Sequence, residues 1–293
     1  MSRVPAYLAA LMLSSALSAE PRSDEILRFD TRGPVASPRS ASLERVIDRD
    51  SGAGYGARFE ELRRLEVPLA SADARHLRAF VREVDPLPAL RATEVQALKN
   101  DILNRLIAGD PDRRALGALL LEVHRDPEQD PVMRDYALQH YASLRQTDPD
   151  ITDDRAHWEA AAGPDPALAA TAMLHLVVLD RRDFPLDHSR RGELGALAHA
   201  LAADSAAPAP PRATALQVCA RLGYAPALPT ASSIARESRN PFPLRISAVA
   251  ALGDLGRGDA STAAYLHSLA DGSETRLRVP AQSALERLQA SAR

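Results

Sequence analysis

One pattern of arginine, alanine and leucine positions recurs along the C-terminal two thirds of the chain. The segments 212–222, 245–255 and 278–288 share the form Arg-x-x-Ala-x-x-x-(Leu/Cys)-x-x-Leu in the same register. The pattern also occurs at 134–144, with Tyr141 in the large position, and at 169–179, where Ala169 replaces the arginine. The five copies begin 35, 43, 33 and 33 residues apart, which is close to the spacing of helical repeat units.

Each copy predicts a helix with one buried face, because its alanine, large residue and leucine lie at i, i+4 and i+7. Between the copies, partner helices are expected at 113–124, 153–162, 192–203, 231–237 and 260–269. Proline follows Asp130 and Asp165 at two helix starts, where its fixed φ suits a first turn and the aspartate can cap it. The sequence therefore predicts an all-α fold, an α-solenoid of about five helical hairpins over residues 110–293.

This arrangement resembles the HEAT repeat family, and in particular the short phycobilisome-lyase HEAT-like repeat, whose helix reads Arg-x-x-Ala-x-x-x-Leu-x-x-Leu. It is also similar to exported bacterial HEAT proteins, a resemblance that implies no activity. The resemblance implies a ladder in which the repeated arginines contact acidic or carbonyl groups of the adjacent repeat, and anion binding is the alternative role for them. Those arginines are Arg134, Arg212, Arg245 and Arg278.

The N-terminal part of the chain is expected to differ from the repeats. Helical spacing without the arginine and alanine predicts an N-terminal helical cap or a diverged repeat at 58–109. Residues 19–57 are rich in Pro, Ser, Gly and Arg and predict a flexible tether, in which only Leu43 to Ile47 hint at a helical turn. Residues 1–18 combine Arg3, an apolar run and a small-residue cleavage site, which predicts a signal peptide. The protein is therefore expected to be exported, periplasmic or extracellular; an uncleaved anchor and a mistaken start codon are alternatives.

The amino-acid composition indicates which side chains fill the core and which classes of partner are disfavoured. Aromatic residues make up 4% of the chain and the broader hydrophobic set 45%, so small aliphatic side chains are expected to fill the core. The net charge is −3 and Lys99 is the only lysine, which gives no basic footprint for a nucleic acid. Cys219 is the only cysteine, so no internal disulfide can form, and its apolar neighbours predict a small buried residue. The N-terminal apolar run is too short for stable membrane insertion.

One acidic segment has the spacing of an EF-hand calcium loop. Its oxygen-bearing residues at positions 1, 3, 5, 7 and 12 are Asp148, Asp150, Thr152, Asp154 and Glu159. Position 6, where the loop needs glycine, is Asp153. The alternative interpretation is a polar linker in which Thr152 or Asp153 caps the helix that carries Trp158.

No other motif indicates catalysis. The eight histidines form no HExxH motif and no close pair on one helical face, and His175 lies in an apolar run that predicts a packed side chain. The adjacent residues Asp187, His188 and Ser189 cannot form a relay, because neighbouring side chains point apart. We therefore expect no enzyme activity, no catalytic residue, no metal and no cofactor.

A solenoid acts through its surface, and the second helices of the hairpins are expected to line a concave face. Positions five and nine residues after each repeat arginine, or after Ala169, should face solvent there. The candidate partner-binding residues are Gln139, Ser143, Leu174, Val178, Gln217, Arg221, Asp254 and Arg287. Their mixed polarity predicts a monomeric, non-enzymatic exported scaffold for a protein or peptide, while an ordinary solvated helix face is the alternative. A bilin lyase-like accessory enzyme and a structural component of an envelope assembly are alternative functions.

Overall fold

The computed structural model describes residues 40–290, apart from 85–86, 88, 149 and 181–184. Within these ranges the regular structure is entirely helical, with no β-strand, so the prediction of an all-α fold is confirmed. The helices are α1 (Ala41–Ile47), α2 (Tyr55–Arg64), α3 (Ser71–Arg82), α4 (Ala92–Gly109), α5 (Arg113–Arg125), α6 (Pro131–Thr147), α7 (Arg155–Ala161), α8 (Pro166–Asp180), α9 (His188–Ala203), α10 (Ala209–Leu222), the short 3-10 helix η1 (Ala225–Ala227), α11 (Leu228–Arg236), α12 (Phe242–Leu255), α13 (Ala260–Asp271) and α14 (Thr275–Ala290).

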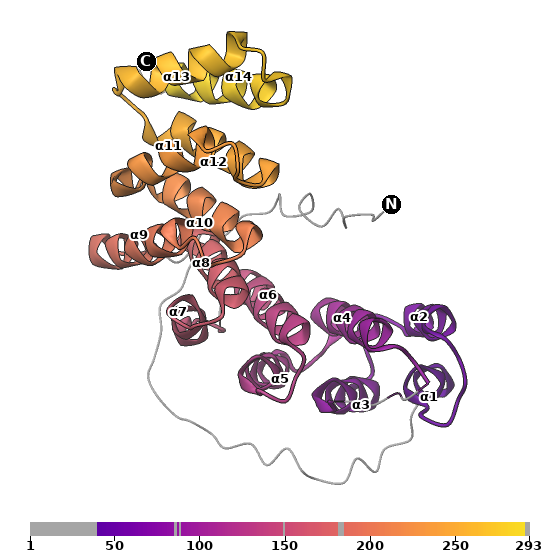
Figure 1. The fold of residues 1–293 in the computed structure, drawn as a ribbon. Helices are drawn as coiled ribbons and strands as arrows, with labels where there is room; N and C mark the ends of the chain where they lie inside the picture. Colours follow the sequence, from indigo (N-terminus) through magenta and orange to yellow (C-terminus); the bar gives the residue numbers. More distant parts are fainter. Residues whose placement is uncertain (1–39, 85–86, 88, 149, 181–184, 291–293) are drawn as a thin grey trace. The chain divides into compact units, whose positions relative to one another are not determined.

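The described helices form hairpins that stack on one another. Each odd-numbered helix packs on the even-numbered helix that follows it, and each even-numbered helix packs on the next even-numbered one (Figure 1). We refer to α2, α4, α6, α8, α10, α12 and α14 as the second-helix row. Contact between successive hairpins is the defining arrangement of a solenoid. The predicted α-solenoid is confirmed, and α5/α6 to α13/α14 are its five expected hairpins.

The helix starts follow from proline and aspartate. Pro131 and Pro166 are the first residues of α6 and α8, where the missing N–H leaves no hydrogen bond unmade. The Asp130 carboxylate accepts a hydrogen bond from the Val132 N–H at 2.8 Å, and Asp165 accepts one from the Ala167 N–H at 2.9 Å. Both predicted caps are confirmed, and each satisfies a backbone donor that the helix itself leaves unpaired.

Small residues let the second-helix row pack closely. The alanines of the repeated pattern are all fully buried, and they are Ala137, Ala172, Ala215, Ala248 and Ala281. In α12, a Cβ atom added to Gly253 would lie 2.7 Å from the Cα atom of Ala284 in α14. The backbones of these two helices therefore approach each other at a point where no side chain fits.

Aspartates also form a recurring hydrogen-bonded turn in the loops that follow the helices. The residue directly after α1, α4, α5, α6 and α9 is an aspartate whose Oδ1 atom accepts the N–H two residues later, at 2.9–3.0 Å. These residues are Asp48, Asp110, Asp126, Asp148 and Asp204. Such turns direct the chain out of one helix toward the next.

Residues 40–57 are folded, which differs from the flexible tether expected over 19–57. Leu43 and Val46 of α1 are completely buried, and Ser40 caps this helix by accepting a hydrogen bond from the Leu43 N–H at 3.2 Å. The helical turn indicated by Leu43 to Ile47 lies within this helix, and burial against α2 and α3 stabilises it. Residues 1–39, with the predicted signal peptide 1–18 and the rest of the tether, lie outside the described residues.

The helices between residues 58 and 109 continue the stack. α3 and α4 form a hairpin, and α4 packs on α6 just as α6 packs on α8. Of the two interpretations left open for this region, the diverged repeat matches this packing. The solenoid therefore includes α1/α2 and α3/α4 in addition to the five hairpins expected from the pattern.

Candidate functional site

The repeat arginines donate hydrogen bonds to the C-terminal end of the first helix of their own hairpins. Arg134, Arg212 and Arg245 each occupy the fourth position of a second helix. Each Nε atom donates to a carbonyl near the end of the preceding helix: to His124 at 2.9 Å, to Ala202 at 3.1 Å and to Ala235 at 3.0 Å, respectively. The last carbonyls of a helix lack partners within it and carry partial negative charge, so a guanidinium stabilises this end.

In the other hairpins, a different donor atom or a different residue makes this contact. Arg278 donates from Nη2 to the Gly272 carbonyl at 3.1 Å. Arg58, also fourth in its helix, is fully buried and donates to four carbonyls of the α1 end and the following loop, at 2.8–2.9 Å. Lys99 takes this role for α3, with its Nζ atom bound to the Glu83 carbonyl. The fourth residue of α8 is Ala169, so α8 supplies no arginine at this position to the end of α7.

These contacts correct the expected ladder between adjacent repeats. Arg134, Arg212 and Arg278 bind carbonyls within their own hairpin. Arg245 does the same and also pairs with Glu274 of the following hairpin, at 2.5 and 2.8 Å. The connection to a neighbouring repeat is thus an addition at Arg245, because an acidic residue stands within reach there.

The candidate partner-binding residues on α12 and α14 hold those two helices together. Arg287 Nε lies 3.3 Å from Asp254 Oδ1, and Arg287 Nη2 donates to the Ala250 carbonyl at 3.0 Å. Asp254 and Arg287 are half-buried rather than fully solvent-facing. On α6, Gln139 and Ser143 are also half-buried, and their side chains bond within the helix. These four residues were expected to face open solvent. Instead, Asp254 and Arg287 contribute to the packing of α12 on α14, and Gln139 and Ser143 bond within α6.

The candidates on α8 and α10 form a more accessible part of the row. Gln217 and Arg221 are exposed on α10, and Leu174 and Val178 are half-buried one turn apart on α8. α8 carries no charged residue between Pro166 and Leu179, so its half-buried residues, which include Leu174 and Val178, are uncharged. We refer to Leu174, Val178, Gln217 and Arg221 as the α8–α10 surface.

Behind this surface, aromatic and cationic side chains of three helices meet in the interior. The His157 ring of α7 lies 5.9 Å from the Tyr141 ring of α6 and 5.6 Å from the His175 ring of α8, edge-on at 77°. Arg145 of α6 lies beside them and donates to the Thr152 carbonyl at 2.9 Å. The sequence predicted His175 as a packed side chain, but it did not indicate that His157 would lie against it.

Burial sets the charge state of this cluster. It lowers the pKa of His175 to about 4 and raises the pKa of Tyr141 to about 12. The pKa of His157 is lowered well below its ordinary value by burial, and further by His175, Arg145 and His124. The histidines are therefore neutral at pH 7. Cys219, fully buried in α10 as predicted, has its pKa raised to about 12 by burial, which leaves it an unreactive thiol.

The acidic segment at 148–159 does not converge on a calcium site. Asp153 binds Arg155 at 2.8 Å, Asp154 pairs with Arg190 at 3.1 Å, and Glu159 pairs with Arg125 at 3.1 Å. The N-cap of α7 is Asp154 rather than Thr152 or Asp153, while Asp153 accepts the Arg155 N–H. Across the described residues, no three His, Cys, Asp or Glu side chains are arranged to hold a metal ion.

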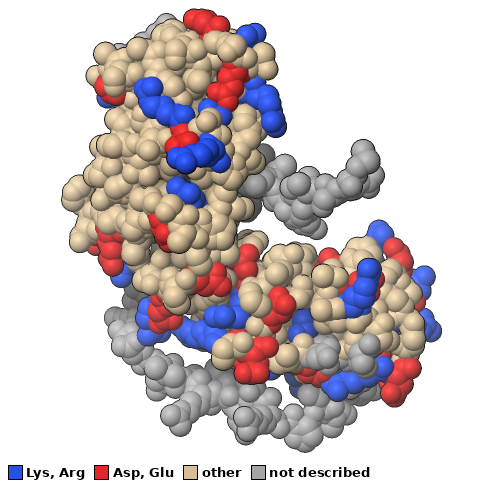
Figure 2. Space-filling view, viewed as in Figure 1, with Lys and Arg blue, Asp and Glu red and all other residues tan. Residues whose placement is uncertain are grey.

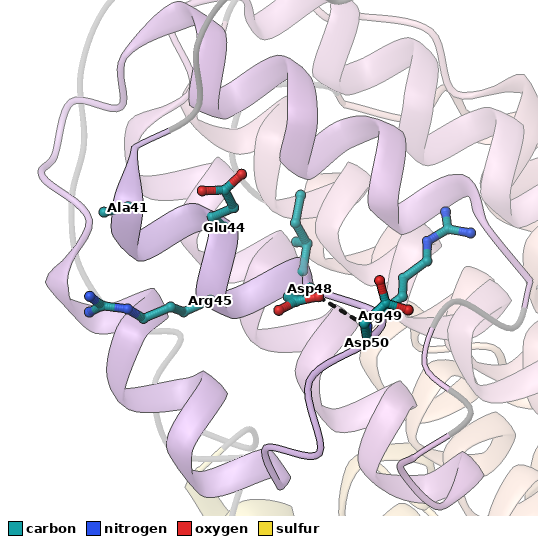
Figure 3. A pocket seen from close by; sticks show the side chains of 7 residues that line it. Ala41, Glu44, Arg45, Asp48, Arg49 and Asp50 are labelled. Atoms are coloured by element: carbon teal, nitrogen blue, oxygen red, sulfur yellow. Dashed lines mark hydrogen bonds between the residues drawn. The ribbon is translucent and has the colours of Figure 1, made fainter.

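Two surface hollows contain charged groups that the protein itself already binds. One, of about 540 Å³, lies beside α1 and its following turn (Figure 3), where Arg45 and Arg49 pair with Glu61 and Glu83. The other, of about 490 Å³, lies by the start of α4 and reaches Lys99, whose Nζ atom donates to backbone and to Gln129 Oε1 at 3.4 Å. Neither hollow presents a convergent set of unused polar groups.

Figure 2 shows how charged side chains are distributed on one face of the protein. On the face shown in Figure 2, basic side chains lie close to acidic ones in most places. None of the helices in the described ranges is both long and apolar enough to span a bilayer. Of the candidate residues expected from the sequence, Gln217 and Arg221 of the α8–α10 surface are the two that are exposed rather than half-buried.

No protein-family model matches the chain, and no curated protein matches it in sequence. Among solved structures, human deoxyhypusine hydroxylase in complex with glycerol is similar to it, with 18% sequence identity. The match covers 85% of this chain and 95% of that chain, at a TM-score of 0.36. A likeness at this level supports no conclusion about what the chain binds or catalyses.

Proposed function

We propose that this chain is a HEAT-like scaffold that binds a protein or peptide through the α8–α10 surface, without enzymatic activity. The observation that carries the proposal is the pairing of accessible aliphatic side chains, Leu174 and Val178, with exposed polar ones, Gln217 and Arg221, on neighbouring second helices. An aliphatic centre with polar groups at its edge is the composition of many protein interfaces.

The chemistry of this surface favours a peptide with an apolar anchor and a nearby acceptor. Leu174 and Val178 can bury an aliphatic or aromatic side chain, while the Gln217 amide can bond to a peptide backbone. Arg221 adds a cation to the edge of the surface, and a guanidinium there suits a carboxylate or a carbonyl.

A site-specific crosslink tests this proposal. A photoreactive residue at Gln217 should give one discrete adduct in the native cell envelope, whereas the same residue at Gln282, exposed on α14, should give none. The crosslinked peptide, once synthesised, should bind the purified chain, and Leu174→Asp should weaken that binding at least about tenfold. A peptide that binds wild type and Leu174→Asp equally would contradict the proposed site.

We further propose that the protein is exported and monomeric. The signal-like residues 1–18 support export, and cleavage after Ser18 would be seen by N-terminal sequencing of the mature protein. The composition of α14 supports a monomer, because this helix exposes Arg278, Gln282 and Glu286 around the single exposed large apolar residue Val279. Light scattering should give a mass near that of one chain; concentration-dependent self-association would favour an assembly component instead.

A further inference from the structure

The helix α7 is held in place by an unusual set of side chains. It is seven residues long, and its buried residues are Ala156, His157, Ala160 and Ala161. His157 is therefore the largest side chain that this helix buries completely. Ala169 leaves the end of α7 without the arginine contact found in other hairpins. A short helix with little buried apolar area opens more readily than its neighbours.

The His157 ring has no polar partner in this interior. Its exposed fraction is 0%, and neither Nδ1 nor Nε2 finds a hydrogen-bond partner among the described residues. His175 is half-buried as a residue, but its Nδ1 atom is shielded from solvent and likewise lacks a partner. A neutral imidazole tolerates this environment at moderate cost, whereas an imidazolium there would be a buried charge without a counterion.

The charged and titratable groups around His157 do not offer that counterion. From α6 it faces Tyr141 and Arg145, from α8 His175, and from α5 His124. The carboxylates nearest α7 are engaged elsewhere. They are Asp153, bound to Arg155; Asp154, bound to Arg190 of α9 and to the Trp158 Nε1 atom; and Glu159, bound to Arg125 of α5.

We propose that α7 is an acid-sensitive element, which detaches from α6 and α8 when His157 and His175 take up protons while the remaining hairpins stay folded. Protonation places two imidazolium groups beside each other and beside the Arg145 guanidinium, and their repulsion is relieved once α7 exposes His157 to water. Detachment uncovers the inner side of α8, the helix that also carries Leu174 and Val178. This inference stands independently of the proposed binding function.

Trp158 reports on this event directly. It is the only tryptophan of the chain, it lies in α7 next to His157, and it is half-buried with the Arg190 guanidinium 5.6 Å from its ring. Its fluorescence emission should move to longer wavelength as pH falls, with a midpoint between about 4 and 6.5. Hydrogen exchange of peptides covering 151–163 should increase at least about tenfold from pH 7.5 to pH 5, after correction for intrinsic rates, while α13 and α14 keep their protection.

Three variants separate this mechanism from general acid unfolding. His157→Leu should move the fluorescence transition to lower pH, and His157→Leu with His175→Leu should abolish it. Because leucine could disturb packing, His157→Gln provides a second non-titrating version with a similar expected result. His140→Gln is the matched control, since His140 is shielded elsewhere on α6 by Asn100 and should leave the α7 transition at the wild-type pH.

The proposal is overturned if wild-type emission is unchanged between pH 8 and pH 4, or if the His157 variants shift at the wild-type pH. It is also overturned if α13 and α14 lose protection together with α7.

Discussion

Single arginines in this protein join a helix end to the helix that follows it. The contact works because a helix ends in carbonyls without partners, and a planar guanidinium can reach them from one helix away. Arg58 makes the largest number of such contacts, since its one buried side chain donates to four carbonyls. Arg245 adds an ion pair with Glu274 to the same contact. The energetic importance of each arginine should therefore follow its burial and its number of acceptors.

We expect Arg245→Ala to lower the free energy of unfolding by about 2 kcal/mol, because the Ala235 carbonyl loses its charged donor and Glu274 loses its partner. Arg278→Ala should cost less than about 0.5 kcal/mol, because Arg278 is exposed and makes a single bond to Gly272. Urea unfolding followed by circular dichroism measures both variants. Equal losses for the two would contradict the role assigned to burial.

The half-buried His140 should make global stability depend on pH. Burial lowers the pKa of His140 from 6.5 to about 4, and its Nε2 atom lies 2.9 Å from Asn100 Oδ1. Because the folded-state pKa lies below the unfolded one, the unfolded chain binds the proton more readily between these values. His140 therefore contributes stability that is complete above pH 6.5 and is lost as pH falls through about 4, roughly 3 kcal/mol in all.

Urea unfolding at pH 7.5, 5.5 and 4.5 measures this loss, and His140→Gln should show a shallower decline with pH than wild type. An unfolding free energy of wild type that stays constant from pH 7.5 to pH 4.5 would show that the folded state binds the proton as readily as the unfolded chain does.

At the scale of the helix, two features decide how one element meets another: small residues where backbones approach, and caps where helices end. α12 and α14 approach each other closely at Gly253 and Ala284. α6 and α8 begin with an aspartate and a proline that fix the entry of the chain. α7 has no arginine contact at its end, and the largest side chain that it buries completely is His157.

Gly253→Ala should destabilise the protein by roughly 1–3 kcal/mol, although alanine is the better helix former. The added Cβ atom would meet Ala284 Cα at 2.7 Å, and backbone atoms cannot move aside as a flexible side chain can. Gly192→Ala in α9 is the control, since nothing lies within 4 Å of its added Cβ atom, and it should stabilise by up to about 1 kcal/mol. Thermal unfolding of the two variants should give melting temperatures that shift in opposite directions.

At the scale of the whole molecule, stability is built from neighbouring hairpins rather than from one central core. The described residues form two buried hydrophobic clusters, and Leu121 packs against both. One cluster extends from α1 to the loop after α6, and the other from α6 to α14. In such a stack each hairpin is stabilised mainly by its neighbours, so a terminal hairpin protects the next one. α1/α2 should have that role at the N-terminal end of the stack.

Comparison of a chain that begins at residue 40 with one that begins at residue 58 tests this role. The shorter chain loses Leu43 and Val46, which are fully buried, and all four carbonyl partners of Arg58. We expect its melting temperature to fall by several degrees, because its loss of apolar burial exceeds 1 kcal/mol. Equal melting temperatures for the two chains would mean that α1 adds nothing to the stack.

The recurrence of alanine and leucine by itself determined that helices form, which face each one buries, and that hairpins follow one another. Those properties depend on residues within a few turns, so periodicity encodes them. Asp130 and Asp165 likewise marked helix starts, because a cap acts on its own first turn.

Only the tertiary structure decided which side chains meet across helices. His157 and His175 come together from α7 and α8, and Asp254 and Arg287 from α12 and α14. Such meetings depend on the rotation and offset of one helix against another, which the packing of many residues sets jointly. The sequence only hinted at the short helix α1 through Leu43 to Ile47, because the burial that stabilises it comes from α2 and α3.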